Sequence, residues 1–72
     1  MERNELLNEL SKIIGVPVEK ITGQEQLGTT PGWDSFAQVE IMLVLEKKFQ
    51  IKIDEKSMNE FITLDRILKI VA

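Results

Sequence analysis

The sequence contains neither cysteine nor histidine. The lack of cysteine excludes disulfides, protein thiol nucleophiles and thiolate metal sites. The lack of histidine excludes Ser-His triads, imidazole general bases and histidine-ligated metals. The acids are scattered along the chain, and no base is placed to activate a serine. We therefore predict that the protein is not an enzyme and has no metal site.

Basic residues are also few. Lysine and arginine number nine against twelve aspartates and glutamates, which gives a net charge of −3. This balance argues against a nucleic-acid-binding protein, which normally presents a basic face. No apolar run approaches the ~18 residues of a membrane span, and the charged first residues do not resemble a signal peptide. We therefore expect no membrane insertion and a cytoplasmic location.

The chain has 72 residues, of which 43% are hydrophobic. This length predicts a single domain, residues 1–72, with enough apolar side chains for a folded core. A chain of this size buries only about 60% of its unfolded surface, so a large internal substrate cavity is not expected.

Residues 2–14 have the pattern of an amphipathic helix, with charged residues on the other side of the wheel. Gly15 suits the position after a helix end, and Pro17 prevents simple continuation. The apolar stripe would bind a partner under one reading, but we interpret it as a core face. Its members are Leu6, Leu7, Leu10, Ile13 and Ile14.

Residues 15–34 form a long connection that contains all four glycines. Loops of this length in a small domain are uncommon unless they are pinned to the core or functional. We predict that Ile21 and Leu27 pin this loop to the core and that a short turn forms around residues 18–22. Trp33 is predicted to be partly buried at the core edge, with an exposed contact surface as the alternative.

The most apolar stretch follows, and it predicts a central helix over residues 35–50. Asp34 suits its N-cap, because a carboxylate accepts hydrogen bonds from the first free backbone amides. We expect one stripe to face the core: Ala37, Ile41, Val44, Leu45 and Phe49. A second apolar stripe lies on nearly the opposite side: Phe36, Val39 and Leu43. It is either buried as well or exposed for partners, and we favour exposure because so few helices cannot surround one completely.

The last third of the chain predicts two further helices. Residues 51–53 are interpreted as an extended connector whose isoleucines point inward. Asp54 is expected to cap a short helix that ends near Phe61, and Thr63 to cap the final helix. The apolar face of the final helix comprises Leu64, Ile67, Leu68, Ile70 and Val71. The predicted fold class is therefore all-α: a small four-helix bundle with a long first loop and a short third helix.

Ser35 lies in the first turn of the central helix, where a serine is either part of a cap or an attachment point. The surrounding residues are Gly32-Trp33-Asp34-Ser35-Phe36, followed by Val39-Glu40-Ile41 and Leu45-Glu46-Lys47-Lys48-Phe49. This pattern resembles the Asp-Ser-Leu helix of acyl carrier proteins. The resemblance extends over nearly the whole chain, since the first helix, the long loop and the last two helices also have counterparts in that family.

The resemblance implies a function. In acyl carrier proteins a phosphopantetheinyl transferase esterifies this serine with 4′-phosphopantetheine taken from coenzyme A, so Ser35 would carry the cofactor and Asp34 would belong to its motif. The chain would then hold an acyl group as a thioester and present it to acyl-loading and acyl-processing enzymes, and we expect a monomer. The matching partner-binding positions are Phe36, Val39, Glu40, Met42, Leu43 and Glu46. A phosphodiester at Ser35 would also suit the positive end of the helix.

Three departures from the family pattern narrow this expectation. Phe36 replaces the usual leucine, Ala37 stands where an acid is common, and Lys47 and Lys48 stand where fatty-acid carriers are typically acidic. Those acids attract basic patches on partner enzymes. We therefore expect a discrete carrier of a specialised pathway, such as polyketide, nonribosomal-peptide or cell-surface polymer assembly, rather than the general fatty-acid carrier.

Two other readings stay open. An aminoacyl or peptidyl carrier would share the serine and the fold. An unmodified helical interaction module would use Ser35 only as part of a cap. If the protein is an acyl carrier, its core, which includes Met42 and Met58, would also be able to hold a short acyl chain between helices.

Overall fold

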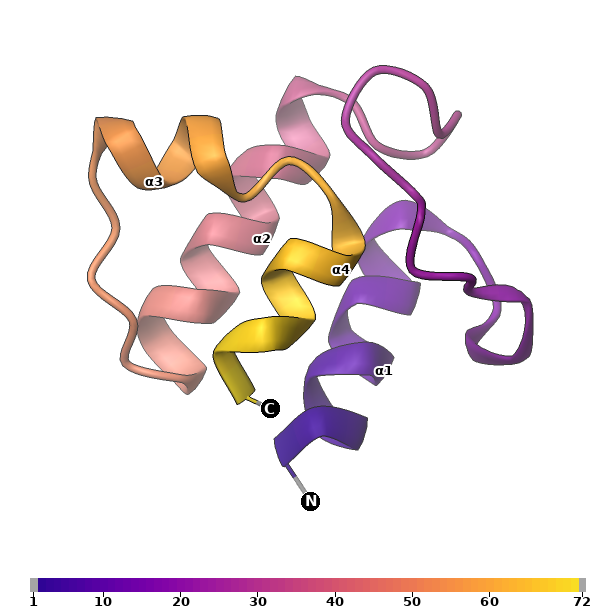
Figure 1. Cartoon of the computed structure of the whole chain (residues 1–72), viewed down its shortest axis with the longest axis horizontal. Helices are drawn as coiled ribbons and strands as arrows, with labels where there is room; N and C mark the ends of the chain where they lie inside the picture. Colours follow the sequence, from indigo (N-terminus) through magenta and orange to yellow (C-terminus); the bar gives the residue numbers. More distant parts are fainter. Residues whose placement is uncertain (1, 72) are drawn as a thin grey trace.

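The computed structural model describes residues 2–71, which fold into α-helices joined by irregular segments (Figure 1). The α-helices are α1 (Glu2–Ile14), α2 (Ser35–Lys48), α3 (Glu55–Glu60) and α4 (Leu64–Leu68). Two short 3₁₀ turns, η1 (Val18–Lys20) and η2 (Lys69–Val71), complete the regular structure. Among residues 2–71 there is no β-strand, and the only β-type pairing is an isolated antiparallel bridge between Gln26 and Thr63. The predicted all-α class is confirmed.

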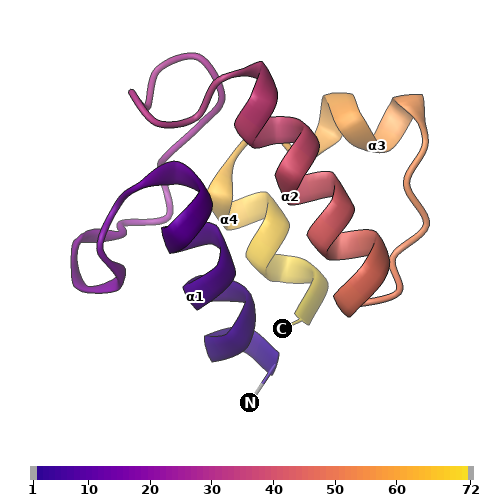
Figure 2. The same ribbon diagram turned by 180° about the vertical axis from the view of Figure 1, so that it is seen from behind.

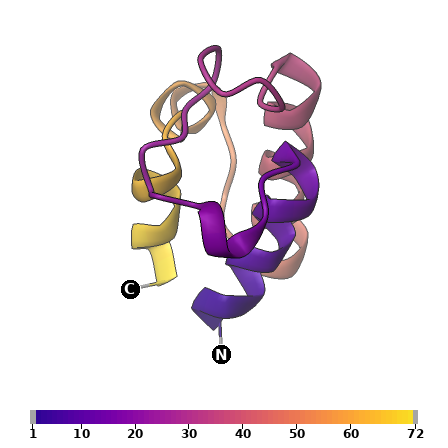
Figure 3. The ribbon, with the colours of Figure 1, turned by 90° about the vertical axis from the view of Figure 1, so that its right-hand side faces the viewer.

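The helices are arranged in two layers. In Figure 2, α1 and α2 lie side by side, and in Figure 3 they form one side of the molecule while α3 and α4 form the other. The long connection between α1 and α2 passes over the edges of both layers. The start of α1 and the end of η2 lie together at one end of the molecule, and the start of α2 lies at the opposite end.

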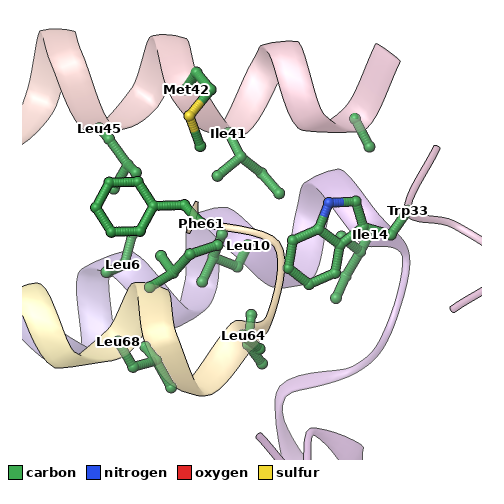
Figure 4. Close-up of a cluster of buried hydrophobic side chains, with 12 residues drawn as sticks. Leu6, Leu10, Ile14, Trp33, Ile41, Met42, Leu45, Phe61, Leu64 and Leu68 are labelled. Atoms are coloured by element: carbon green, nitrogen blue, oxygen red, sulfur yellow. The ribbon is translucent and has the colours of Figure 1, made fainter. Parts of the chain in front are cut away.

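The core lies between the two layers (Figure 4). Helices α1, α2 and α4 contribute buried side chains to it, whereas α3 contributes none. Its members are Leu6, Leu10, Ile14, Trp33, Ala37, Ile41, Met42, Leu45, Phe61, Leu64, Ile67 and Leu68. Trp33 is only 1% exposed, so the prediction of partial burial was wrong. The physical reason is that its indole N–H finds a hydrogen-bond partner inside the protein, which removes the need for solvent.

The boundaries of the first two helices follow from local chemistry. The structure confirms α1 over residues 2–14, and Gly15 follows it with φ of 73°, a left-handed conformation that glycine adopts without strain. The prediction placed the end of α2 at residue 50, but the helix ends at Lys48. The chain leaves the helix because Gln50 adopts φ of 56°, and the amide of Ile51 then donates back to the carbonyl of Leu45 at 3.0 Å.

The last two helices begin where the sequence predicts. The Asp54 carboxylate accepts a hydrogen bond from the Ser57 amide at 2.8 Å, which confirms Asp54 as the N-cap of α3. This bond is the main cause that lowers the pKa of Asp54. Thr63 occupies the N-cap position of α4, but its side chain makes no capping hydrogen bond. The expected side-chain cap was therefore wrong; the Thr63 backbone lies instead in the bridge to Gln26.

The long connection is tied to the segment just before and within α4. The Leu27 amide donates to the carbonyl of Ile62 at 2.9 Å, and the Leu64 amide donates to the carbonyl of Glu25 at 2.8 Å. Ile21 and Leu27 pack against the core, as predicted. Burial alone would raise the pKa of Glu25, but hydrogen bonds from backbone amides, including that of Thr22, outweigh it and lower the pKa. The loop therefore presents the start of α2 from a fixed position.

Among residues 2–71, no helix has the length and apolar character that crossing a membrane requires.

Candidate functional site

Ser35 is the first residue of α2, and its side chain is exposed. The residue before it, Asp34, has extended backbone angles, and its carboxylate accepts a hydrogen bond from the Ala37 amide at 2.9 Å. The Asp34 carbonyl accepts from the Gln38 amide at 2.9 Å. This is the geometry of an N-cap, and it confirms the predicted role of Asp34. The amides of Ser35 and Phe36 have no partner within the helix, because the carbonyls four residues before them lie outside α2.

The turn that leads into Ser35 is set by close packing. The Trp33 amide donates to the carbonyl of Thr30 at 2.9 Å, which closes a β-turn around Pro31 and Gly32. A Cβ atom at Gly32 would overlap the carbonyl group of Ile14 at the end of α1. Only glycine therefore allows the turn to approach α1 this closely. The turn, the end of α1 and the start of α2 are fixed relative to one another by this contact.

A buried polar network connects Trp33, two residues before Ser35, to α2 and to the end of α3. The Trp33 indole N–H donates to Oε1 of Gln38 at 2.7 Å. Nε2 of Gln38 donates to the carbonyls of Met58 at 3.1 Å and Phe61 at 2.9 Å. Gln38 is only 4% exposed. The role of Gln38 was not predicted from the sequence; the available signal was a polar residue on the inward side of α2, five positions after the only tryptophan.

The second apolar stripe of α2 is exposed in the folded chain. Phe36, Val39 and Leu43 are 83%, 48% and 46% exposed, and the acids Glu40 and Glu46 beside them are also exposed. The stripe therefore forms an open face that continues from Ser35 along the helix. This is the arrangement that the sequence analysis favoured over burial of both stripes.

Met42 does not lie on that exposed face. It is 4% exposed, so its placement among the surface positions was wrong. The buried face of α2 is wider than the predicted stripe and includes the Gln38 and Met42 side, because the segment leading to Phe61 packs there. Val44 and Phe49, predicted on the core stripe, are only half-buried.

Met42 instead forms part of a groove beside the exposed face. The groove has a volume of about 230 Å³ and lies between α2, the connector after it and α3. Its lining residues are Val39, Met42, Leu43, Glu46, Ile53 and Met58. All except Glu46 are apolar, so the groove would accept an apolar group rather than a charged one.

The far end of α2 carries positive charge. Lys47 is exposed, and Lys48 forms an ion pair with Glu9 of α1 at 2.8 Å. The hydrogen bond from Lys48 lowers the pKa of Glu9, and the same bond raises the pKa of Lys48. The pair joins α2 to α1, whereas the exposed Lys47 forms no ion pair with a described residue.

This arrangement suits Ser35 to receive a group rather than to perform catalysis. Within residues 2–71, no side chain that would act as a base makes a hydrogen bond to the Ser35 hydroxyl. The unpartnered amides at the start of α2, together with the helix dipole, favour a negatively charged substituent at this position.

The comparison with protein families agrees with this geometry. The family model for the phosphopantetheine attachment site matches residues 4–71, which is nearly the whole chain. No curated protein matches the sequence. Because the match covers all of the α-helices except the first two residues of α1, the chain belongs to the phosphopantetheine attachment site family.

Proposed function

We propose that Ser35 is the residue to which 4′-phosphopantetheine is attached, and that the protein carries an acyl group for partner enzymes. Members of this family are non-catalytic carriers with a covalently attached 4′-phosphopantetheine. The observation that carries the assignment to Ser35 is its position: an exposed hydroxyl at the first residue of α2, directly after the Asp34 cap.

The residues around Ser35 fit a phosphodiester. The amides of Ser35 and Phe36 point out of the start of a helix of 14 residues, where an anion is stabilised by about 0.3–1 kcal/mol. The Asp34 carboxylate is engaged with the Ala37 amide and so is directed along the helix. When bound, the cofactor supplies the thiol that the chain lacks, and this thiol forms the thioester with the cargo.

The surface next to Ser35 supports an acyl rather than an aminoacyl cargo. The groove of about 230 Å³ offers apolar walls from Met42, Ile53 and Met58. An acyl chain would gain about 25 cal/mol for each Å² of apolar surface that it buries there. A charged amino group would lose hydration on entering the groove, and only one lining residue, Glu46, carries an acid to pair with it.

The exposed face of α2 supports a role with dedicated partners. We propose that the transferase and the acyl-loading and acyl-processing enzymes contact Phe36, Val39, Glu40, Leu43 and Glu46, with the helices acting as a small monomeric four-helix bundle. Phe36 would require a larger apolar recess in the partner than leucine does. Lys47 would oppose a strongly basic partner patch. Both features favour a specialised pathway over general fatty-acid synthesis.

Intact-protein mass spectrometry tests the attachment site. The protein is incubated with coenzyme A and a promiscuous phosphopantetheinyl transferase, with Ser35→Ala and Ser57→Ala as variants. We expect one phosphopantetheine on the wild type and on Ser57→Ala, and none on Ser35→Ala. Ser57 is a suitable control because it also lies in the first turn of a helix. Modification of Ser35→Ala, or no modification of the folded wild type, would contradict the proposal.

A competition assay tests the pathway. The modified protein and a general fatty-acid carrier are offered together to a malonyl transferase and a ketosynthase of fatty-acid synthesis. We expect the general carrier to be processed at least about tenfold faster, because the charge attraction on α2 is weaker here. Equal processing of the two carriers would remove the specialised assignment while leaving Ser35 as the attachment site.

A further inference from the structure

The Gln38 side chain makes three hydrogen bonds, and all three join it to groups outside α2. Its side-chain carbonyl accepts from the Trp33 indole at 2.7 Å, and its amide nitrogen donates to the carbonyls of Met58 and Phe61. An indole N–H only donates and backbone carbonyls only accept, so only one orientation of the amide satisfies all three partners. The side chain therefore has one defined position between the loop before Ser35 and the end of α3.

The helix at the other end of this contact, α3, is attached near its C-terminal end, where its C-cap Phe61 is buried in the core and Glu60 forms an ion pair with Arg66 of α4 at 3.5 Å. None of the six residues of α3 is buried. A helix of this length is not stable by itself in water. Its first turn is capped by Asp54, but that cap belongs to the same segment and does not attach α3 to α2. The carbonyls that Gln38 binds belong to the last turn of α3 and to its C-cap, where helix carbonyls lack partners within the helix.

The same contact lies at one wall of the groove. Met58 supplies a carbonyl to Gln38 and also lines the groove, opposite Val39 and Met42 of α2. Val39 follows Gln38 directly in the sequence and lies one turn after Ser35. The width of the groove therefore depends on where the end of α3 is held.

We propose that Gln38 is a positioning residue: by binding the Met58 and Phe61 carbonyls it holds α3 against α2 and fixes the wall of the groove beside Ser35. Trp33 orients the Gln38 amide for this contact. The inference depends on the proposed function only in treating this wall as part of the surface that partner enzymes meet.

Hydrogen exchange on the unmodified protein tests the contact itself. Gln38→Met keeps the length of the side chain and removes both donors and the acceptor, and Gln24→Met, at an exposed position, is the matched control. We expect the amides of residues 58–61 to exchange about tenfold or more faster in Gln38→Met, while those of α1 and α2 change much less. Unchanged exchange in α3, or an equal increase in all helices, would overturn the proposal.

A measurement on the wild type keeps the proposal testable if Gln38→Met does not fold. When α3 moves away, the Gln38 side-chain amide loses its two acceptors at the same moment. We therefore expect exchange of the Gln38 side-chain amide protons and of the backbone amides of residues 58–61 to be slowed by the same factor, each compared with an unprotected amide of its own kind. Gln38 amide protons that remain protected while α3 exchanges would show that the contact does not hold the helix.

Transferase kinetics separate positioning from direct participation. We expect Gln38→Met to raise the KM for the carrier severalfold with kcat within about twofold, because the Asp34 cap and Ser35 stay in place. A fall in kcat at unchanged KM would overturn the positioning role. Failure of the transferase to modify even the wild type would instead count against Ser35 as the attachment site, and the exchange result would stand independently of it.

Discussion

The two faces of α2 differ in what holds them. On the inner face Ala37, Ile41 and Leu45 are 6%, 0% and 0% exposed, whereas Phe36, Val39 and Leu43 on the outer face are 83%, 48% and 46% exposed. The inner face therefore stabilises the fold, and the outer face contributes little to it. Three large apolar side chains along one exposed stripe are better explained by contact with other proteins than by folding.

The largest effect is expected from a matched pair of leucines on these two faces. Leu45→Ala should lower the free energy of unfolding by about 2–5 kcal/mol, because it removes a fully buried side chain and leaves a cavity. Leu43→Ala, two residues earlier, should cost about 1 kcal/mol or less and should instead raise the KM for the transferase. Urea unfolding and transferase kinetics measure the two effects. Equal losses of stability in the two variants would contradict the division between the faces.

The inner half of this comparison was largely predictable from the sequence. Helical spacing identified Ala37, Ile41 and Leu45 as core residues, and it also identified α1 with its observed bounds. The two aspartate caps were predictable because capping depends on a single local hydrogen bond. These features depend on residues that are close together in the sequence, so the pattern contains the information.

What the sequence did not reveal depends on contacts between distant segments. The complete burial of Trp33 requires Gln38 as its partner, and Gln38 is oriented by the carbonyls of Met58 and Phe61, which lie 20 and 23 residues further along the chain. Met42 was assigned to the partner-binding positions by the resemblance to acyl carrier proteins, and neither that resemblance nor the wheel of α2 shows which side of the helix the segment before Phe61 covers. Of the candidate site, the serine and its cap were therefore accessible from the sequence, whereas the groove and the buried network were not.

An intermediate effect is expected at the point where both faces begin. Asp34→Ala should lower the free energy of unfolding by about 0.5–2 kcal/mol, because the Ala37 amide loses its capping partner. Asp34→Asn should lower the free energy of unfolding by at most a few tenths of the loss in Asp34→Ala, since asparagine caps equally well. Thermal unfolding of both variants measures the difference. A loss in Asp34→Asn as large as that in Asp34→Ala would show that charge, not capping, is what Asp34 provides to the fold.

The smallest effect concerns the ion pair that fastens the inner side of α2 to α1. The hydrogen bond from Lys48 lowers the pKa of Glu9 below its ordinary value of 4.5, so this stabilisation is complete above pH 4.5 and is lost as the pH falls through the lowered pKa. The same bond raises the pKa of Lys48 above 10.5, so its contribution is complete below that value and is lost as the pH rises beyond it.

Glu9→Gln should therefore be slightly less stable than the wild type at neutral pH and equally stable in strong acid, as measured by urea unfolding at a series of pH values. Glu46→Gln is the matched control, because Glu46 lies on the outer face and no described residue forms an ion pair with it. The gap between Glu9→Gln and the wild type should close with falling pH, whereas Glu46→Gln should follow the wild type throughout. If Glu46→Gln showed the same closing gap, the pH dependence would reflect overall charge rather than a contact specific to the inner side of α2.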